Sequence, residues 1–226
     1  MLSLRAAALS DIGRVRHENE DRFLLDESNR IFGIADGVGG LPGGGEAAQL
    51  AADEIIAGLK DRSADQEPDL VKLMRHTNRA VANLGVTISR SMGIGTTLTF
   101  GCIHGDLMLI GHVGDSRCYL LRQSKLIQVT DDHSVENDAR LARARGETVH
   151  YHDLNRNALT RCIGQPSPLE VDVIRQPLHA GDRYLFCTDG VTRLIPDPEL
   201  ETLLGKADSP KAVSYTHLTL PTNREV

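Results

Sequence analysis

The chain has 226 residues, of which 40% are apolar and 25% charged, and its formal net charge is −6. This size and composition are typical of a soluble globular protein with one domain or at most two small ones. Basic residues are neither in excess nor clustered, which argues against a nucleic-acid partner. No apolar run approaches the roughly 18 residues of a membrane-spanning helix, so we expect no membrane segment.

The first half of the chain predicts a strand, a hairpin and two helices. Residues 1–13 are short and weakly apolar, and we interpret them as an N-terminal strand rather than a signal peptide. Residues 22–35 contain two apolar runs around a polar turn, which indicates a β-hairpin. After a glycine-rich loop, apolar residues recur at helical spacing over 46–60 and over 70–88. Both helices are amphipathic, so each should cover a sheet.

The second half is richer in strands. Residues 97–113 and 118–130 each predict two strands joined by a tight turn. Residues 133–147 are polar and helix-like, residues 183–190 form a further strand, and residues 197–204 a short helix. Because the helices come in a block and the strands in antiparallel hairpins, an α+β fold is favoured over alternating βαβ units.

The cysteines and histidines indicate neither disulfides nor zinc. Four widely spaced cysteines form no CxxC pair: Cys102, Cys118, Cys162 and Cys187. We interpret them as small buried residues in a reducing compartment, which predicts a cytoplasmic protein. The nine histidines show no zinc-ligand spacing.

Acidic residues fall at the ends of apolar strands. Asp36, Asp115 and Asp189 each end such a strand beside a glycine, and Glu20-Asp21 precedes the first hairpin strand. A single aspartate there can be a plain turn residue, but the repeated ending predicts that these carboxylates converge. Converging carboxylates repel each other unless they share a cation or protons. All-oxygen ligation favours a hard ion, Mg²⁺ or Mn²⁺.

Such a site fits phosphate chemistry. Two divalent ions about 3.5–4 Å apart can share a water and lower its pKa, which supplies a nucleophile at neutral pH. Arg16 stands four residues before Glu20. Its guanidinium can form two hydrogen bonds with a phosphate, although a plain surface arginine fits the position equally well.

Seven strings carry a family resemblance. They are, in chain order, SDIGRVRHENED, ADGVGG, GIGTTLT, HVGDSRCYLLR, IQVTDDHS, NALTRCIG and GDRYLFCTDG. Together they resemble the motifs of the metal-dependent protein phosphatases of the 2C type (the PPM family), over about residues 4–204 and most closely in its bacterial branch. The resemblance implies a four-layer αββα sandwich, in which two stacked antiparallel sheets are flanked by helices.

The same resemblance implies an activity and its partners. The enzyme would hydrolyse phosphoserine and phosphothreonine in proteins, by direct attack of an activated water and without a phosphoenzyme. Its substrates would be phosphoproteins made by a serine/threonine kinase, in signal transduction, and the protein would act as a monomer without nucleic-acid or membrane partners. Residues 133–158 correspond to the variable flap beside the site, which should influence which phosphoproteins bind.

Site roles also follow from the resemblance. It implies two Mn²⁺ or Mg²⁺ ions and a weak third. Asp36 would bridge both ions, the Gly37 carbonyl would bind one, Glu20 and Asp189 would hold the other, Asp21 would fix metal-bound water, Asp115 would contribute to the third ion, and Arg16 would grip the phosphate. Thr96 and Thr97 should pack behind the site.

Two departures from the family pattern lie within the motifs. Val38 stands where some eukaryotic members have a histidine proposed as general acid, so water or another residue must take that role. Arg193 stands four residues after Asp189, where the family often has an aspartate. A third ion would therefore be poorly held.

The largest departure is at the end of the chain. Ser209 and Pro210 suit the start of a helix, but the following stretch has no helical period and lacks the family's late Asp-Asn motif. We therefore expect a phosphatase domain over residues 1–213 that is incomplete at its C-terminus, followed by a non-family tail over 214–226.

Two other functions stay open at this point. A catalytically impaired or non-catalytic module of the same fold, with a binding or regulatory role, is favoured by the missing late ligand and opposed by the retained acidic residues. A nucleotide site on LPGGGEAA is physically reasonable, because glycines before a helix can cradle phosphate. However, the chain has neither GxxxxGK[ST] nor GxGxxG.

Overall fold

The computed structural model describes residues 4–14, 16–60, 62–63, 65–89, 91–166 and 168–213. Within them the strands form two antiparallel sheets, one ordered β1-β2-β3-β4-β7 and the other β6-β5-β8. The strands are β1 (Asp21–Asp26), β2 (Ile31–Asp36), β3 (Leu98–His104), β4 (Leu107–Val113), β5 (Arg117–Arg122), β6 (Lys125–Gln128), β7 (Asp172–Pro177) and β8 (Arg183–Cys187). The helices are α1 (Gly44–Lys60), α2 (Leu70–Ile88), α3 (Val135–Ala144), α4 (Asp189–Thr192) and α5 (Asp197–Lys206), with a 3₁₀ turn at Asp153–Asn155.

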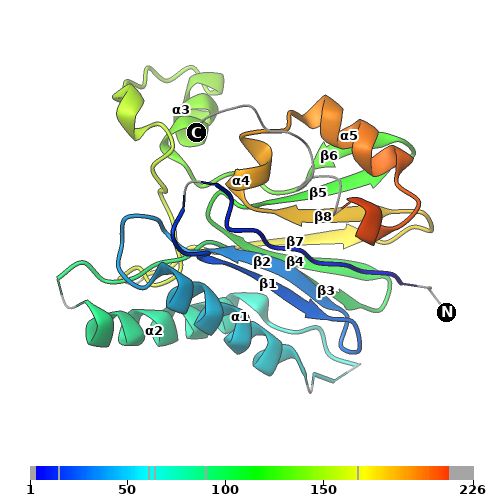
Figure 1. The fold of residues 1–226 in the computed structure, drawn as a ribbon, viewed down its shortest axis with the longest axis horizontal. Helices are drawn as coiled ribbons and strands as arrows, with labels where there is room; N and C mark the ends of the chain where they lie inside the picture. Colours follow the sequence, from blue (N-terminus) through cyan, green and yellow to red (C-terminus); the bar gives the residue numbers. More distant parts are fainter. Residues whose placement is uncertain are drawn as a thin grey trace.

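The elements stack in four layers, which confirms the predicted αββα sandwich (Figure 1). Helices α1 and α2 cover the outer face of the five-stranded sheet through a core that includes Leu24, Ile55 and Met74. Between the two sheets lies a smaller cluster around Ile110 and Cys118. A third cluster joins the three-stranded sheet to α5. Each layer thus buries an apolar face, as stacked elements must.

The predicted hairpins form with the expected pairing. Strand β1 pairs with β2, β3 with β4, and β5 with β6, all antiparallel. The last of these turns at Gln123 and Ser124, whose φ angles of 52° and 62° lie in the left-handed region that two-residue hairpin loops of type I′ require. Local turn chemistry and apolar patterning therefore agree with the tertiary pairing.

Helices α2 and α3 and the helical residues 210–213 begin at side-chain caps. The Asp69 carboxylate accepts a hydrogen bond from the N–H of Lys72 at 2.9 Å and starts α2. Ser134 caps α3 in the same way, at the base of the flap. Ser209 caps the helical residues 210–213 through the N–H of Ala212, as predicted. Such caps satisfy backbone donors that have no partner within the helix.

The structure corrects the sequence predictions in three places. Residues 4–12 form no strand, because they pair with no neighbouring strand in the described part of the chain. Strand β7 was not predicted, since its sequence DVIRQP is polar and its order comes from pairing with β4. Residues 189–190 belong to the short helix α4 rather than to a strand end. The tail predicted over 214–226 lies outside the described residues.

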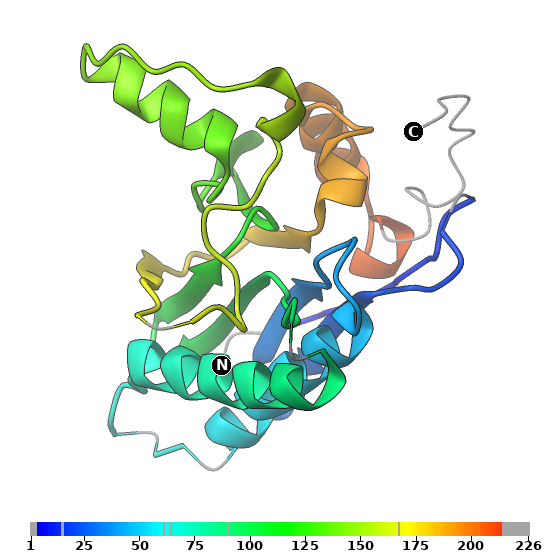
Figure 2. The ribbon, with the colours of Figure 1, turned by 90° about the vertical axis from the view of Figure 1, so that its left-hand side faces the viewer.

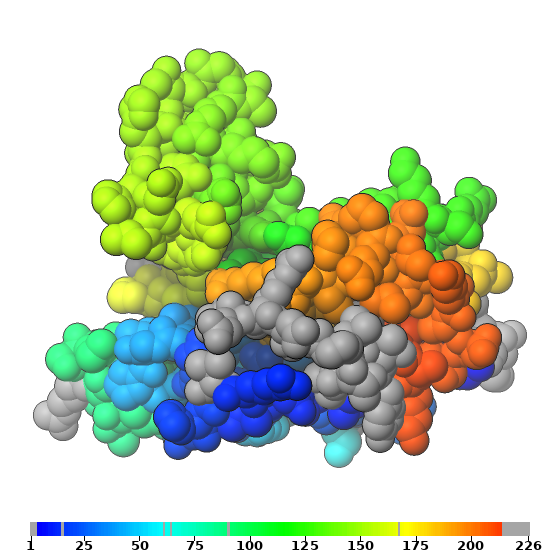
Figure 3. Space-filling view, turned by 45° about the horizontal axis from the view of Figure 1, so that its top comes forward, coloured from blue at the N-terminus to red at the C-terminus, as the bar shows by residue number. Residues whose placement is uncertain are grey.

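The flap stands apart from the layers. Figures 2 and 3 show α3 and the segment after it as a lobe that projects beyond both sheets, beside a hollow bordered by α4 and α5. Among the helices that the structure describes, none has the length and apolar character needed to cross a membrane.

Candidate metal and phosphate site

Asp21 and Asp36 face each other at one end of the five-stranded sheet. Asp21 begins β1 and Asp36 ends β2, and the two are direct partners in the antiparallel register. Their carboxyl groups are hydrogen-bonded to each other. Two carboxyl groups so close together cannot both be charged without a cation. The pairing therefore has the chemistry of a site that either shares a proton or binds metal.

The charges of two further aspartates, Asp115 and Asp189, affect the ionisation of Asp36. The pKa of Asp36 is raised to about 9, first by burial and then by the charges of Asp21, Asp189 and Asp115. Burial is also the main cause of the raised pKa of Asp115, about 6, with Asp189 second. The structure thus pairs Asp21 with Asp36 and places Asp115 and Asp189 close enough for their charges to act on Asp36.

A threonine joins the two sheets at this point. The Thr188 hydroxyl donates a hydrogen bond to Asp21 Oδ2 at 3.0 Å, across 167 positions of sequence. Thr188 directly follows β8 of the second sheet and immediately precedes Asp189, the first residue of α4. Burial raises the pKa of Asp21, and the hydrogen bond from Thr188 partly offsets this because it favours the charged carboxylate. The sequence analysis did not single out Thr188, although its place beside Asp189 was the available signal.

Glu20 lies close to the backbone of Gly37 and Gly44. The Gly37 N–H donates to the Glu20 carbonyl at 3.2 Å. A Cβ added at Gly44 would lie 2.4 Å from Glu20 Oε1, and one at Gly37 would lie 2.9 Å from the Glu20 Cβ. The glycines therefore make room for the Glu20 side chain at the start of α1. Space for Glu20 explains the glycine at position 44 without the nucleotide site considered for LPGGGEAA.

Arg16 is exposed and lies over the loop that follows Gly37. Its guanidinium nitrogens would be 3.2 and 3.3 Å from a Cβ at Gly39. The absence of a side chain at Gly39 thus leaves space for the guanidinium over this loop. An exposed guanidinium at this place can receive a phosphate through paired hydrogen bonds.

Thr96 and Thr97 support the site from behind, as predicted. Both are buried. The Thr97 hydroxyl accepts from the Asp36 N–H at 3.0 Å, and the Thr96 hydroxyl donates to the Asp36 carbonyl at 2.9 Å. These bonds fix the backbone of Asp36 to the segment that precedes β3, and so they help to set the direction of its carboxyl group.

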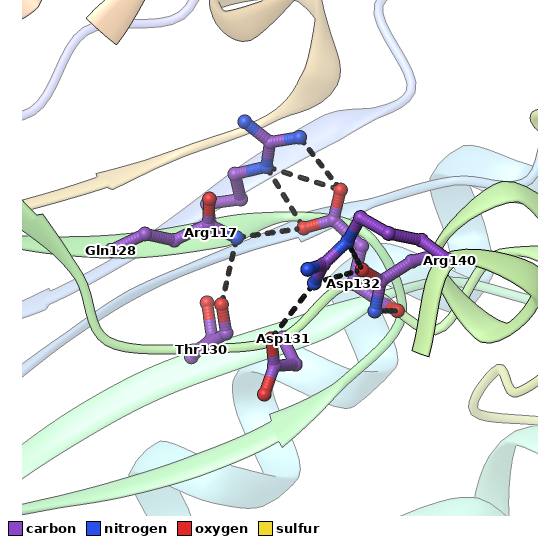
Figure 4. Close-up of a pocket in the computed structure, with 7 residues that line it drawn as sticks. Arg117, Gln128, Thr130, Asp131, Asp132 and Arg140 are labelled. Carbon is purple, nitrogen blue, oxygen red and sulfur yellow. Dashed lines mark hydrogen bonds and ion pairs between the residues drawn. The ribbon is translucent and has the colours of Figure 1, made fainter. Parts of the chain in front are cut away.

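The flap is anchored by a polar network outside the carboxylate cluster. Figure 4 shows Arg117, which forms a two-pronged ion pair with Asp132. Both residues line a cavity of about 320 Å³. Gln128 donates to the same carboxylate at 3.1 Å, and Asn137 of α3 donates to the Asp132 carbonyl at 2.7 Å. Because these groups bond mainly to one another, we interpret the network as the joint between the flap and the second sheet.

The donor set fits a hard divalent cation. Carboxylates and the Gly37 carbonyl offer oxygen ligands, which Mg²⁺ and Mn²⁺ prefer. In the described part of the chain, no three His, Cys, Asp or Glu side chains already stand grouped as a metal-binding cage. The four free cysteines, three of them buried, offer no such group either. Asp36 is half-buried, and a cation bound among its carboxylate neighbours would displace the proton that its raised pKa favours.

Comparison with known proteins identifies the family. The family described as "Protein phosphatase 2C" matches residues 14–223. The serine/threonine phosphatase stp of Listeria monocytogenes is 31% identical over 210 residues, which are 89% of this chain and 83% of that protein. PstP of Mycobacterium tuberculosis, a serine/threonine protein phosphatase, is 36% identical over 223 residues, 96% of this chain but 41% of that protein.

Solved structures agree with this assignment. The catalytic domain of PstP, in complex with two manganese ions, superposes with a TM-score of 0.76 at 29% identity, over 95% of this chain and 89% of that one. The serine/threonine phosphatase of S. agalactiae gives 0.79 at 26% identity, over 93% and 90%. The chain belongs to the protein phosphatase 2C family, whose members hydrolyse phosphoserine and phosphothreonine.

Proposed function

We propose that this chain is a metal-dependent serine/threonine protein phosphatase whose active site is the carboxylate cluster around Asp36. The observation that carries the proposal is the direct pairing of Asp21 with Asp36, under the charges of Asp115 and Asp189. Family membership and the two manganese ions of the PstP catalytic domain support the same assignment.

The residues take the following roles in this proposal. Asp36 and the Gly37 carbonyl would hold one ion. Asp36, Glu20 and Asp189 would hold the other, and Asp115 would contribute to a weak third. Two such cations, when bound, stabilise charge on the phosphate and supply an activated water. Asp21, held by Thr188, orients that water through a hydrogen bond.

Arg16 binds the substrate phosphate. Its exposed guanidinium lies over Gly39, so a phosphate can reach it from solvent while it approaches the carboxylates. Two parallel hydrogen bonds fix the orientation of the phosphoryl group, and the positive charge offsets repulsion between the phosphate and the acidic cluster. Val38, in the same loop, offers no proton, so water or another residue must supply the proton of the leaving oxygen.

The finer properties are proposed on similar grounds. The substrates are phosphoproteins made by a serine/threonine kinase, and the chain acts on them as a monomer in signal transduction. Free thiols at four positions suit a reducing compartment, which favours the cytoplasm. Either Mn²⁺ or Mg²⁺ suits the all-oxygen donor set.

The test is phosphate release from a phosphothreonine peptide, with Mn²⁺ and with chelator. The wild-type chain should release phosphate with metal alone, and Asp36→Asn should lose the activity while it stays folded. Arg16→Ala should raise the KM for the peptide by roughly tenfold. Arg14→Ala removes an exposed arginine two residues earlier and is the matched control. It should leave the KM for the peptide unchanged.

A folded chain that binds Mn²⁺ but releases no phosphate would contradict the catalytic role. It would favour the non-catalytic module instead. If the Arg16 and Arg14 substitutions change the KM equally, Arg16 does not bind the phosphate. The assignment of the carboxylates as metal ligands would not be affected.

A further inference from the structure

Arg193 is ion-paired with a proposed metal ligand. Its Nη2 contacts Asp189 Oδ2, one helical turn earlier, and its N–H donates to the Asp189 carbonyl at 2.9 Å. Between residues of the described part of the chain, no other ion pair involves one of the proposed ligands. The single turn of α4 thus places a fixed positive charge beside the site.

The charge of Arg193 reaches more than one carboxylate. Its charge acts on Asp115 as well as on Asp189, with which it is ion-paired. Asp189 in turn acts on Asp36 and Asp21. Arg193 therefore reduces the repulsion among these carboxylates. The same charge must oppose the approach of a divalent cation, because like charges repel.

We propose that Arg193 is an internal counter-ion, which stabilises Asp189 in the metal-free chain and lowers the affinity of the site for divalent cations. The inference rests on the proposed function, since it takes Asp189 as a ligand. Arg193 is then a positioning residue that acts through Asp189. It raises the metal concentration that is needed to reach the active form of the enzyme.

This role predicts two effects of opposite sign. Arg193→Gln removes the charge, so Mn²⁺ should bind more tightly while the metal-free chain becomes less stable. Asp189 is 29% exposed and Arg193 46%, so solvent screens the interaction, and we expect a change in the dissociation constant of roughly five- to tenfold. Arg193→Lys keeps the charge and should restore both properties nearly to wild type.

The experiment compares the wild type, Arg193→Gln and Arg193→Lys by calorimetric titration with Mn²⁺ and by thermal unfolding in chelator. Arg145→Gln is the matched control, because it removes an exposed arginine from an ion pair of the flap, with Glu147 at 2.8 Å. It should leave Mn²⁺ affinity unchanged. A merely structural role for Arg193 would lower stability without tightening Mn²⁺ binding, and that result would overturn the proposal.

Two outcomes separate this inference from the proposed function. If the wild type binds Mn²⁺ and all variants bind it equally, the counter-ion role is wrong and the phosphatase assignment stands. If the wild type and Asp36→Asn both fail to bind Mn²⁺, the metal site itself is wrong and the inference falls with it.

Discussion

The N–H of Gly114 donates a hydrogen bond to Nδ1 of His133 at 3.1 Å, and the N–H of His133 donates to the Gly114 carbonyl at 2.8 Å. Because Nδ1 accepts, the neutral ring carries its proton on Nε2, which lies 3.2 Å from Asp172 Oδ2. His133 is buried, and its main chain also binds Thr160 at the end of the flap. The ring thus joins the flap and β7 to the turn that presents Asp115.

His133→Ala should destabilise the fold through this turn. The substitution leaves the buried Gly114 N–H without an acceptor, which costs about 1–3 kcal/mol. His133→Asn keeps an acceptor near the Nδ1 position and should recover at least half of the loss. Urea unfolding of the three proteins in chelator measures both effects. If the Ala and Asn variants lose the same stability, the Gly114 bond is not the reason for the histidine.

The stability of the metal-free chain should fall as the pH rises toward 9. The pKa of Asp36 is about 9 in the folded chain and 3.8 in the reference state. Above pH 4 the folded chain therefore holds a proton that the unfolded chain has lost, and this stabilisation disappears as the pH rises through the folded pKa. Between pH 6.5 and 8.5 the loss amounts to at most about 3 kcal/mol, since one pKa unit corresponds to about 1.4 kcal/mol.

Chemical unfolding in chelator at several pH values tests this dependence. Asp36→Asn cannot ionise, so its unfolding free energy should change much less over the same range. The range stops at pH 8.5 because the cysteine thiols, with a reference pKa of 9.0, begin to ionise above it in the unfolded chain. Equal slopes for the two proteins would show that Asp36 does not carry the retained proton.

Thr188→Val should reduce activity more than stability. Valine keeps the shape of the buried threonine but removes the hydroxyl that donates to Asp21. Loss of a partner that orients a metal-site carboxylate typically costs 10–100-fold, so we expect kcat on a phosphothreonine peptide to fall about tenfold. Thr188→Ser retains the hydroxyl and should keep most of the activity. A valine variant with wild-type kcat would exclude Thr188 from the site.

Gly44→Ala should weaken metal binding, whereas Gly45→Ala should not. A Cβ at Gly44 would meet Glu20 Oε1 at 2.4 Å, so the carboxylate must move. At Gly45 the nearest atom is Arg22 Nη2 at 3.4 Å, an ordinary contact. We expect roughly a tenfold loss of Mn²⁺ affinity at the first position, measured by calorimetry. At the second, alanine should stabilise the helix by up to about 1 kcal/mol. Unchanged affinity in Gly44→Ala would remove Glu20 from the ligand set.

Sequence patterns were sufficient where structure depends on local chemistry. The helix from Leu70 to Ile88 follows from apolar periodicity and an aspartate cap, and the β5–β6 hairpin from two short runs around a tight turn. Strand β7 was missed because its polar sequence is ordered by β4, more than fifty residues earlier. The N-terminal segment was wrongly predicted as a strand, since a strand needs a neighbour that the sequence does not show.

For the site, the sequence by itself determined which residue types stand at the strand ends: Asp36, Asp115 and Asp189 beside glycines, after Glu20 and Asp21. Their chemistry was therefore readable before any fold was known. The tertiary structure alone decided that Asp21 meets Asp36 face to face and that Thr188 reaches Asp21 across 167 positions. Such contacts depend on how two separate sheets stack, and stacking is set by burial of whole apolar faces rather than by any local pattern.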